Sequence, residues 1–316
     1  MPQFLLKRLL TLIATLIATS IIVFLVLEIL PGDPALLVLG IDATDEQLAV
    51  FRQQYGLDRP ILERYTDWIG NLLVGDFGIS YAYKTPVWQM IADRLPLTYP
   101  LTLMAMLLTI LLALGLGVFA AARHNKPADV IVMGISQLGI SIPNFWFGLL
   151  LILLFAVNLG WLSAGGFPGW ADGLGPGLQS LILPSIALAA VQAAILARIT
   201  RSSVLEVLRE DFVRTARAKG LSRHAVLWRH VLRNALIPVV TMIGLQFGNL
   251  LAGAIVVEQV FSLPGLGRLI FQAINNRDIE VVKAAVVLLA FTVVTVNFIV
   301  DVLYAVIDPR LKARDV

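Results

Sequence analysis

The chain has 316 residues, of which 58% are hydrophobic and 14% are charged, and its formal net charge is +3. So large an apolar share excludes an ordinary soluble globular protein. The absence of cysteine excludes disulfides, thiolate metal sites and a cysteine nucleophile. The basic residues border long apolar segments instead of forming a soluble face, which argues against nucleic-acid binding.

Long charge-free runs predict six transmembrane helices, because about 20 apolar residues cross about 30 Å of hydrocarbon. The first run resembles a signal peptide in position, but its apolar stretch is long and no Ala-x-Ala cleavage site follows, so we expect an uncleaved anchor. The sequence therefore predicts an all-α, polytopic membrane protein. In chain order the runs lie between Arg8 and Glu28, between Arg94 and Arg123, from Asp129 to about Leu159, from about Leu178 to Arg198, from Arg233 to Glu258, and from Lys283 to about Ile307.

The distribution of Lys and Arg predicts the orientation of these helices. Most of the 24 basic residues fall on the side of the two termini, where the connections are mostly short. We therefore expect both termini in the cytoplasm. In this arrangement residues 1–30 hold the first helix, 31–95 form an extracytoplasmic insert, 96–310 form a five-helix core with a cytoplasmic loop at about 201–233, and 311–316 form a cytoplasmic tail.

The insert is predicted to be helical. Thr44 and Gln47 have the spacing of a capping box, which starts a helix that runs to about Tyr55. The segments from Pro60 to Leu73 and from Pro86 to Leu95 each begin with a proline, which suits the first turn of a helix. A plain connecting loop of this length would be uncommon, so we expect a small helical domain on the outer face.

The cytoplasmic loop is basic and is predicted to form two helices. One helix is expected from Val204 to Lys219, where Gly220 would stop it in the left-handed conformation. Ser222 would cap a second helix, on which Leu221, Ala225, Trp228 and Leu232 recur at helical spacing. A basic amphipathic helix on anionic lipid is one interpretation. Docking of a partner protein is the other, and the glycine turn favours it because a surface-lying helix needs no such turn.

In these segments the chain resembles permease subunits of ABC importers, in the branch that carries dipeptides, oligopeptides and nickel. The resemblance extends over nearly the whole chain. In the family the coupling loop usually begins with Glu-Ala-Ala and has Gly after three further residues. Here Arg214-Thr215-Ala216 takes those positions, so no acidic contact is expected there. The matching segments are Leu30-Pro-Gly-Asp-Pro34, Gly75-Asp-Phe-Gly78, Arg214-Thr-Ala-Arg-Ala-Lys-Gly220, Arg233-Asn-Ala-Leu-Ile-Pro238, Phe261-Ser-Leu-Pro-Gly-Leu-Gly267, Asp301-Val-Leu-Tyr304 and Asp308-Pro-Arg310.

The resemblance implies the type I importer architecture in a bacterial inner membrane, with a second, similar permease as partner. It also implies two cytoplasmic subunits that bind ATP and Mg²⁺, and an extracytoplasmic solute-binding protein. The sequence agrees that ATP binds elsewhere, because Gly78 to Thr85 comes nearest to a phosphate-binding loop and has Tyr83 in place of its second glycine. The expected coupling residues are Arg214, Thr215, Ala216, Arg217, Ala218, Lys219, Gly220, Leu221, Ser222, Trp228 and Arg229.

Polar side chains inside the predicted spans are the candidates for a substrate path, since such groups are unfavourable in lipid and should face protein or water. Hydrogen bonding between helices is the competing interpretation for each of them. The candidates are Asn144, Gln192, Gln246, Asn249, Asn297 and Asp301.

By the resemblance, the expected cargo is a short peptide, with glutathione, a nickel complex or another small solute as alternatives. No catalytic or metal site and no cofactor of this chain's own is expected. An intramembrane hydrolase would need a histidine beside a nucleophile such as Ser141. All the histidines, His124, His224 and His230, lie in segments predicted to be cytoplasmic, and the motif His-Glu-x-x-His is absent.

Overall fold

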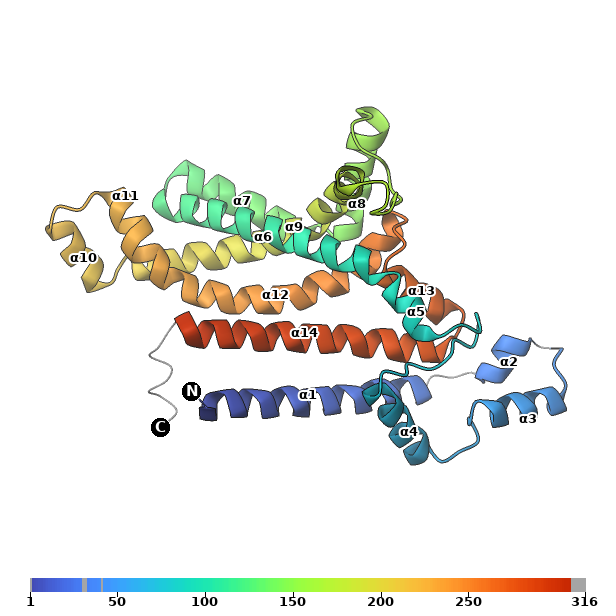
Figure 1. Cartoon of the computed structure of the whole chain (residues 1–316). Coiled ribbons are helices and arrows are strands. Elements are labelled where there is room, and N and C mark those ends of the chain that lie inside the picture. The colour runs from blue at the N-terminus through green and yellow to red at the C-terminus, as the bar shows by residue number, and fades with distance from the viewer. Residues whose placement is uncertain (1, 30–32, 41, 308–316) are drawn as a thin grey trace. The chain divides into compact units, whose positions relative to one another are not determined.

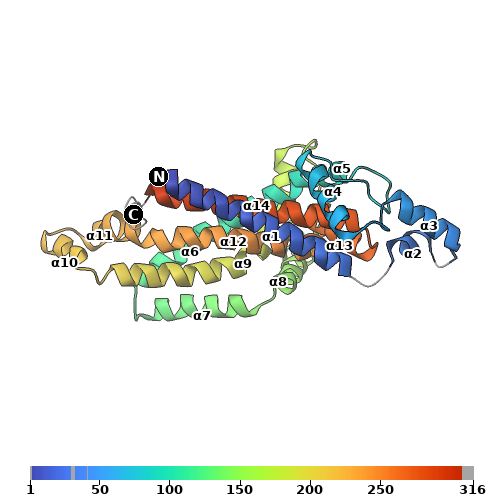
Figure 2. The ribbon, with the colours of Figure 1, turned by 90° about the horizontal axis from the view of Figure 1, so that it is seen from below.

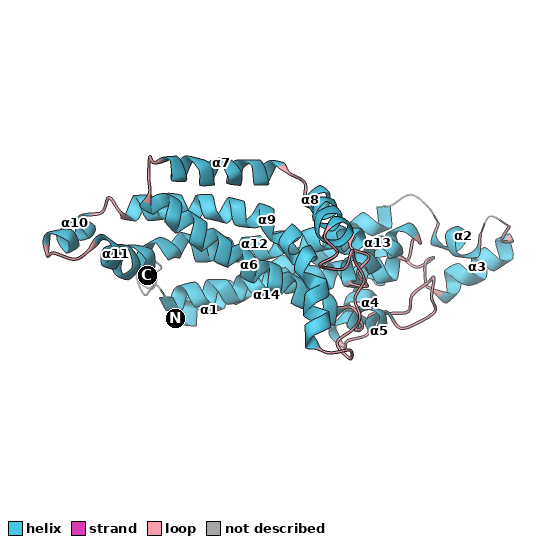
Figure 3. Cartoon of the chain, turned by 90° about the horizontal axis from the view of Figure 1, so that it is seen from above, coloured by secondary structure: helices cyan, strands magenta, loops and turns pink. Residues whose placement is uncertain are grey.

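A computed structural model describes residues 2–29, 33–40 and 42–307, and the regular elements in these ranges are helices (Figures 1 and 3). The chain divides into two compact units. The insert unit comprises residues 7–98 and 264–295, and the core unit comprises the described parts of residues 1–6, 99–263 and 296–316. Three segments that the sequence analysis singled out, Leu30-Pro31-Gly32, Asp308-Pro309-Arg310 and the tail at 311–316, lie outside the described residues.

The insert is helical, as its capping signals predict. Thr44 Oγ1 accepts a hydrogen bond from the Gln47 amide, and Gln47 Oε1 accepts one from the Thr44 amide, which confirms the capping box. The insert unit contains most of α1 (Pro2–Ile29), then α2 (Pro34–Leu39), α3 (Asp45–Gln54), α4 (Ile61–Leu73), α5 (Val87–Ala92), α13 (Leu266–Asn275) and the first half of α14 (Ile279–Ile307).

The core unit is built around α9, which packs against α7, α8 and α12 (Figure 2). Small residues permit the closest approaches. A Cβ atom on Gly117 of α6 would lie 2.7 Å from the carbonyl oxygen of Ala197 in α9. The elements are α6 (Leu95–Ala122), α7 (Pro127–Ser141), α8 (Asn144–Leu151), the π-helical turn η1 (Ile152–Asn158), α9 (Leu174–Val207), α10 (Asp211–Ala218), α11 (Arg223–Val226), the π-helical turn η2 (Leu227–Val231) and α12 (Leu232–Val260).

Five helices of the described chain are long and apolar enough to cross a membrane: Leu6–Ile29, Val87–Ala122, Leu174–Val207, Arg223–Val260 and Ile279–Val302. They correspond to five of the six predicted spans.

The third predicted span is wrong as one continuous helix, because α7 and the segment Asn144–Asn158 meet at an angle of 104°. Pro143 explains the break, since a residue before proline is pushed out of the helical conformation, and Ile142 is extended. The count of six spans stays a prediction that requires this bent pair to form one crossing.

The basic loop also differs from its prediction. The expected helix from Val204 to Lys219 is wrong, because α9 ends at Val207 and α10 begins at Asp211. Residues 201–207, which were assigned to the loop, belong to α9. The break has a packing reason. Val204 and Val213 enter the same buried cluster, whereas nine positions at about 100° per residue would place them on opposite faces of a straight helix.

Candidate functional site

The basic loop forms a compact hairpin of α10 and α11 that continues through η2, which we call the basic hairpin (Asp211 to Val231). Gly220 has φ of +84°, as its sequence position predicts. The Gly220 amide donates to the Arg217 carbonyl at 2.9 Å and the Leu221 amide donates to the Ala216 carbonyl at 3.4 Å, the paired bonds of a Schellman motif. Ser222 Oγ then accepts from the Ala225 amide at 3.2 Å. Both predicted turn signals are therefore present.

The inner side of the basic hairpin is packed on the core unit. Val213, Ala216 and Val226 are buried in one cluster with side chains from three long helices. These partners are Val118 and Ala121 of α6, Val204 of α9, and Ala235 of α12. A displacement of the hairpin therefore acts on the ends of α6, α9 and α12 together.

The outer side of the basic hairpin carries exposed aromatic, aliphatic and basic side chains. Phe212 is 42%, Leu221 40% and Trp228 53% exposed, while Arg214 and Arg217 are also exposed. Of the predicted stripe, Leu221 and Trp228 are exposed, whereas Ala225 and Leu232 are partly buried and Leu232 packs against the buried cluster. Figures 1 and 2 show the hairpin beyond the ends of α9 and α12.

An ion-pair cluster at the same end of the core unit was not predicted. The carboxylate of Asp129 at the start of α7 is 3% exposed and accepts two hydrogen bonds from the Arg201 guanidinium of α9, at 2.6 and 2.7 Å. His124 Nδ1 lies 3.4 Å from the same carboxylate. The basic and acidic partners lie 72 positions apart, so one sequence gives no signal that pairs them.

The polar side chains proposed for a substrate path do not share one environment. Gln192 and Gln246 are buried, and their Oε1 atoms have no hydrogen-bond partner among the described residues. Asn144 lies against Gly253, and Asn297 against Gly244, where a Cβ atom would meet Asn297 Oδ1 at 3.2 Å. The remaining two candidates are Asn249, which is exposed, and Asp301, which is partly buried.

In the insert unit, a loop is held by a buried carboxylate that the sequence did not predict. Asp278, directly before α14, is fully buried and accepts hydrogen bonds from Ser80 Oγ and from the Tyr81 and Ala82 amides. The amide distances are 3.1 and 3.2 Å. The first turn of α14 thereby fixes the loop that joins α4 to α5.

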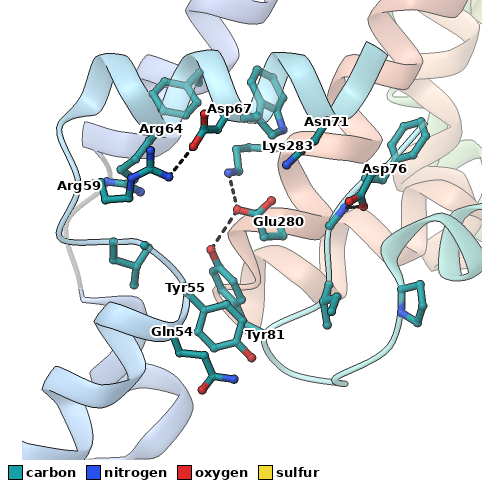
Figure 4. A pocket seen from close by; sticks show the side chains of 18 of the residues that line it. Gln54, Tyr55, Arg59, Arg64, Asp67, Asn71, Asp76, Tyr81, Glu280 and Lys283 are labelled. Carbon is teal, nitrogen blue, oxygen red and sulfur yellow. Dashed lines mark hydrogen bonds and ion pairs between the residues drawn. The ribbon is translucent and has the colours of Figure 1, made fainter. Parts of the chain in front are cut away.

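Beside this contact lies an open cavity of about 770 Å³, which Figure 4 shows. Glu280 Oε1 accepts from the Tyr81 hydroxyl at 3.0 Å and from Lys283 Nζ at 2.5 Å. Lys283 Nζ also lies 5.7 and 5.6 Å from the ring centroids of Phe24 and Trp68, within range of a cation–π interaction. Burial and the Glu280 carboxylate raise the pKa of Tyr81 above its usual value, so the hydroxyl stays protonated and donates.

Two family models match the chain. Residues 113–313 match the family described as binding-protein-dependent transport system inner membrane component, and residues 1–102 match the N-terminal part of such a component. The chain therefore belongs to the binding-protein-dependent transport system inner membrane components. It is a permease subunit of an ABC importer, a multi-pass and non-catalytic membrane protein.

Curated relatives match over the whole length. The glutathione transport system permease protein GsiC of Salmonella typhimurium (strain LT2) is 46% identical over 314 residues, covering 99% of this chain and 100% of that protein. GsiC of Escherichia coli (strain K12) is 45% identical over 314 residues, which again cover 99% of this chain and 100% of that protein.

Solved structures share the fold. An inward-facing form of the MetNI methionine ABC transporter gives a TM-score of 0.60 at 19% identity, covering 70% of this chain and 97% of that one. An amino acid ABC transporter with histidines gives a TM-score of 0.53 at 17% identity, covering 68% of this chain and 93% of that one.

Proposed function

We propose that this permease carries short peptides across the cell membrane by alternating access, driven by separate ATPase subunits that dock on the basic hairpin. The observation that carries the proposal is the two-sided hairpin. Its inner side packs on α6, α9 and α12, while Phe212, Leu221 and Trp228 remain exposed on its outer side. A helix lying on lipid would direct its apolar face to the membrane, whereas here Val213 and Val226 pack inside the protein.

The ATPase subunits would supply the chemistry that this chain does not. ATP and Mg²⁺ would bind to them, and closure of the two nucleotide sites would push on the outer side of the hairpin. Because the hairpin shares one buried cluster with three helices, the push would reach α6, α9 and α12 at the same time. This proposal places the hairpin and both termini in the cytoplasm, and the excess of Lys and Arg on that side of the predicted spans supports it.

A second permease would complete the membrane path. Asn249 on α12 is exposed, and so are Leu245 and Val256 on the same helix, at 55% and 47%. An amide that faces lipid is unfavourable, so this side of α12 should be covered by protein. The family resemblance favours a distinct second permease, which makes a heterodimer.

The proposal of peptide cargo is based on the importer branch that the sequence resembles. A solute-binding protein would deliver the peptide to residues 35–95 and to the loop from Phe261 to Gly267. Glutathione is the second candidate, because relatives 45–46% identical over the whole chain are named as glutathione permeases. Glutathione is itself a tripeptide, so both candidates belong to one chemical class.

ATP-dependent uptake of labelled tripeptides and of glutathione into vesicles tests the proposal. The vesicles would contain this chain, its co-purifying subunits and its binding protein. Gly220→Pro should abolish uptake, since proline cannot adopt the positive φ of this turn. Gly220→Asn is the matched control and should retain uptake, because asparagine tolerates that conformation. Normal uptake by Gly220→Pro would refute the coupling role, and uptake of glutathione alone would refute a general peptide cargo.

A further inference from the structure

The cavity in the insert unit has unused hydrogen-bond acceptors. Glu280 Oε1 is occupied by Tyr81 and Lys283, while Glu280 Oε2, which lies near Gly78, has no hydrogen-bond partner among the described residues. Asp76 uses Oδ1 to accept from the Gly78 amide at 2.9 Å, and its Oδ2 likewise has no partner in the described part of the chain. Each of these two carboxylate oxygens can accept a hydrogen bond from an ammonium group.

Donors line the other side of the same cavity. Arg64 gives one N–H to Glu28, and Arg59 pairs with Glu63 and Asp67. Each guanidinium has five N–H donors, so both arginines retain donors for a carboxylate. In Figure 4 the arginines and Asp76 lie on opposite sides of Glu280.

The charges and side chains that line the cavity restrict the kind of ligand that it can bind. Three cations (Arg59, Arg64 and Lys283) and three anions (Asp67, Asp76 and Glu280) line the cavity. A lining without net charge favours a neutral zwitterion over an anion or a cation, because a ligand with net charge meets no compensating excess. The volume of about 770 Å³ lies within the usual range for small-molecule sites. Aromatic rings form part of the wall, among them Trp68 and Tyr81.

We infer that this cavity is a subsite for the zwitterionic main chain of a short peptide, with its amino group at Glu280 and Asp76 and its carboxylate at Arg59 and Arg64. The inference rests on the proposed function and adds to it a place where the permease itself contacts cargo. The subsite is formed by residues of the insert unit alone.

The test is direct binding of labelled trialanine to the purified transporter complex in nanodiscs, without the solute-binding protein. Asp76→Asn keeps the acceptor for the Gly78 amide but removes the charge, and it should weaken binding about tenfold, the loss of one charge-assisted hydrogen bond. N-acetylated trialanine should bind weakly and should not respond to Asp76→Asn. Asn71→Trp places a large side chain at the rim and should abolish binding. Glu46→Gln, an exposed site on α3 outside the cavity, is the matched control and should bind as the unaltered complex does.

The outcomes separate this inference from the proposed function. No trialanine binding, or binding unaffected by both Asp76→Asn and Asn71→Trp, overturns the subsite, even when the full system imports peptide. In a parallel measurement with the solute-binding protein added, an Asn71→Trp complex that still binds trialanine but associates less with that protein would make the cavity a docking surface and also overturn the subsite. Failure of uptake in the full system with every peptide would instead refute the proposed cargo.

Discussion

The contact between Asp278 and the loop after α4 offers a sharp test of the structure. Asp278→Ala removes the acceptor of the Tyr81 amide, the Ala82 amide and the Ser80 hydroxyl. Ser80 and Asp278 are fully buried, and Tyr81 is 4% exposed. Water therefore has little access to the Ser80 hydroxyl and the Tyr81 amide, whereas Ala82 is exposed.

The magnitude follows from those donors. An unsatisfied buried donor costs about 1–3 kcal/mol. Ala82 is exposed, so its amide can turn to water, and we count only the Ser80 hydroxyl and the Tyr81 amide at about 1.5 kcal/mol each, or about 3 kcal/mol in total. At about 1.4 kcal/mol per factor of ten, the loop should open about 100-fold more often. Asp278→Asn retains one acceptor oxygen and should have about a tenfold effect.

Hydrogen exchange of the Tyr81 and Ala82 amides measures this opening directly. Their exchange in Asp278→Ala should be about 100-fold faster than in the unaltered protein, while amides of α9 should not change. Asp76→Ala is the matched control, because Asp76 is exposed and, within the described part of the chain, accepts a hydrogen bond from the Gly78 amide alone. Unchanged exchange in Asp278→Ala, or an equal effect of Asp76→Ala, would refute the assignment of Asp278 as the residue that holds the loop.

Three further predictions concern single contacts. Gly117→Val should destabilise the core unit by at least about 2 kcal/mol, because its Cβ would lie 2.7 Å from the Ala197 carbonyl oxygen. Thermal unfolding in detergent measures this loss, and Gly134→Val is the control, because no atom lies within 4 Å of a Cβ at that position. Arg201→Met should cost about 3 kcal/mol, because the buried Asp129 carboxylate would lose both guanidinium hydrogen bonds and keep the Asn125 amide and His124 as neighbours. Asp129→Asn in the same chain should restore most of this loss, and an unrepaired double variant in the same assay would contradict this reasoning. The pKa of Tyr81 is raised in the folded state, so the contribution of this hydroxyl to stability is complete below about pH 10 and is lost at higher pH. Tyr81→Phe should therefore reduce the fall in stability at alkaline pH. An unchanged pH profile of stability would show that Tyr81 does not cause this fall.

Local signals in the sequence predicted the parts of this fold that depend on neighbouring residues. Thr44 and Gln47 form their capping box, and Gly220 and Ser222 make the turn and cap expected of them. Each of these contacts joins residues within a few positions, and glycine, serine and threonine leave few alternatives there. Hydrophobic runs located five long helices for a similar reason, since length and apolar content decide which segments can cross a membrane.

Most of the features that the sequence did not predict correctly depend on contacts between residues that lie far apart in the chain. The break between α9 and α10 brings Val204 and Val213 into one cluster, and local helix propensity between Val204 and Lys219 gave no sign of it. Pro143 was a local signal for the bend after α7, but the long charge-free run around it favoured one span. The pairs Asp129–Arg201 and Ser80–Asp278 join residues 72 and 198 positions apart, beyond what a single sequence reveals.

The basic hairpin has a consequence for how the transporter is put together. Its Val213, Ala216 and Val226 side chains are already buried against α6, α9 and α12 of the same chain, so the docking surface should be folded before any ATPase subunit arrives. Association would then order few residues, and little conformational entropy would be lost at that step. A permease assembled in this way could wait in the membrane in a binding-competent form, and the ATPase subunits could leave and return without the membrane part having to refold.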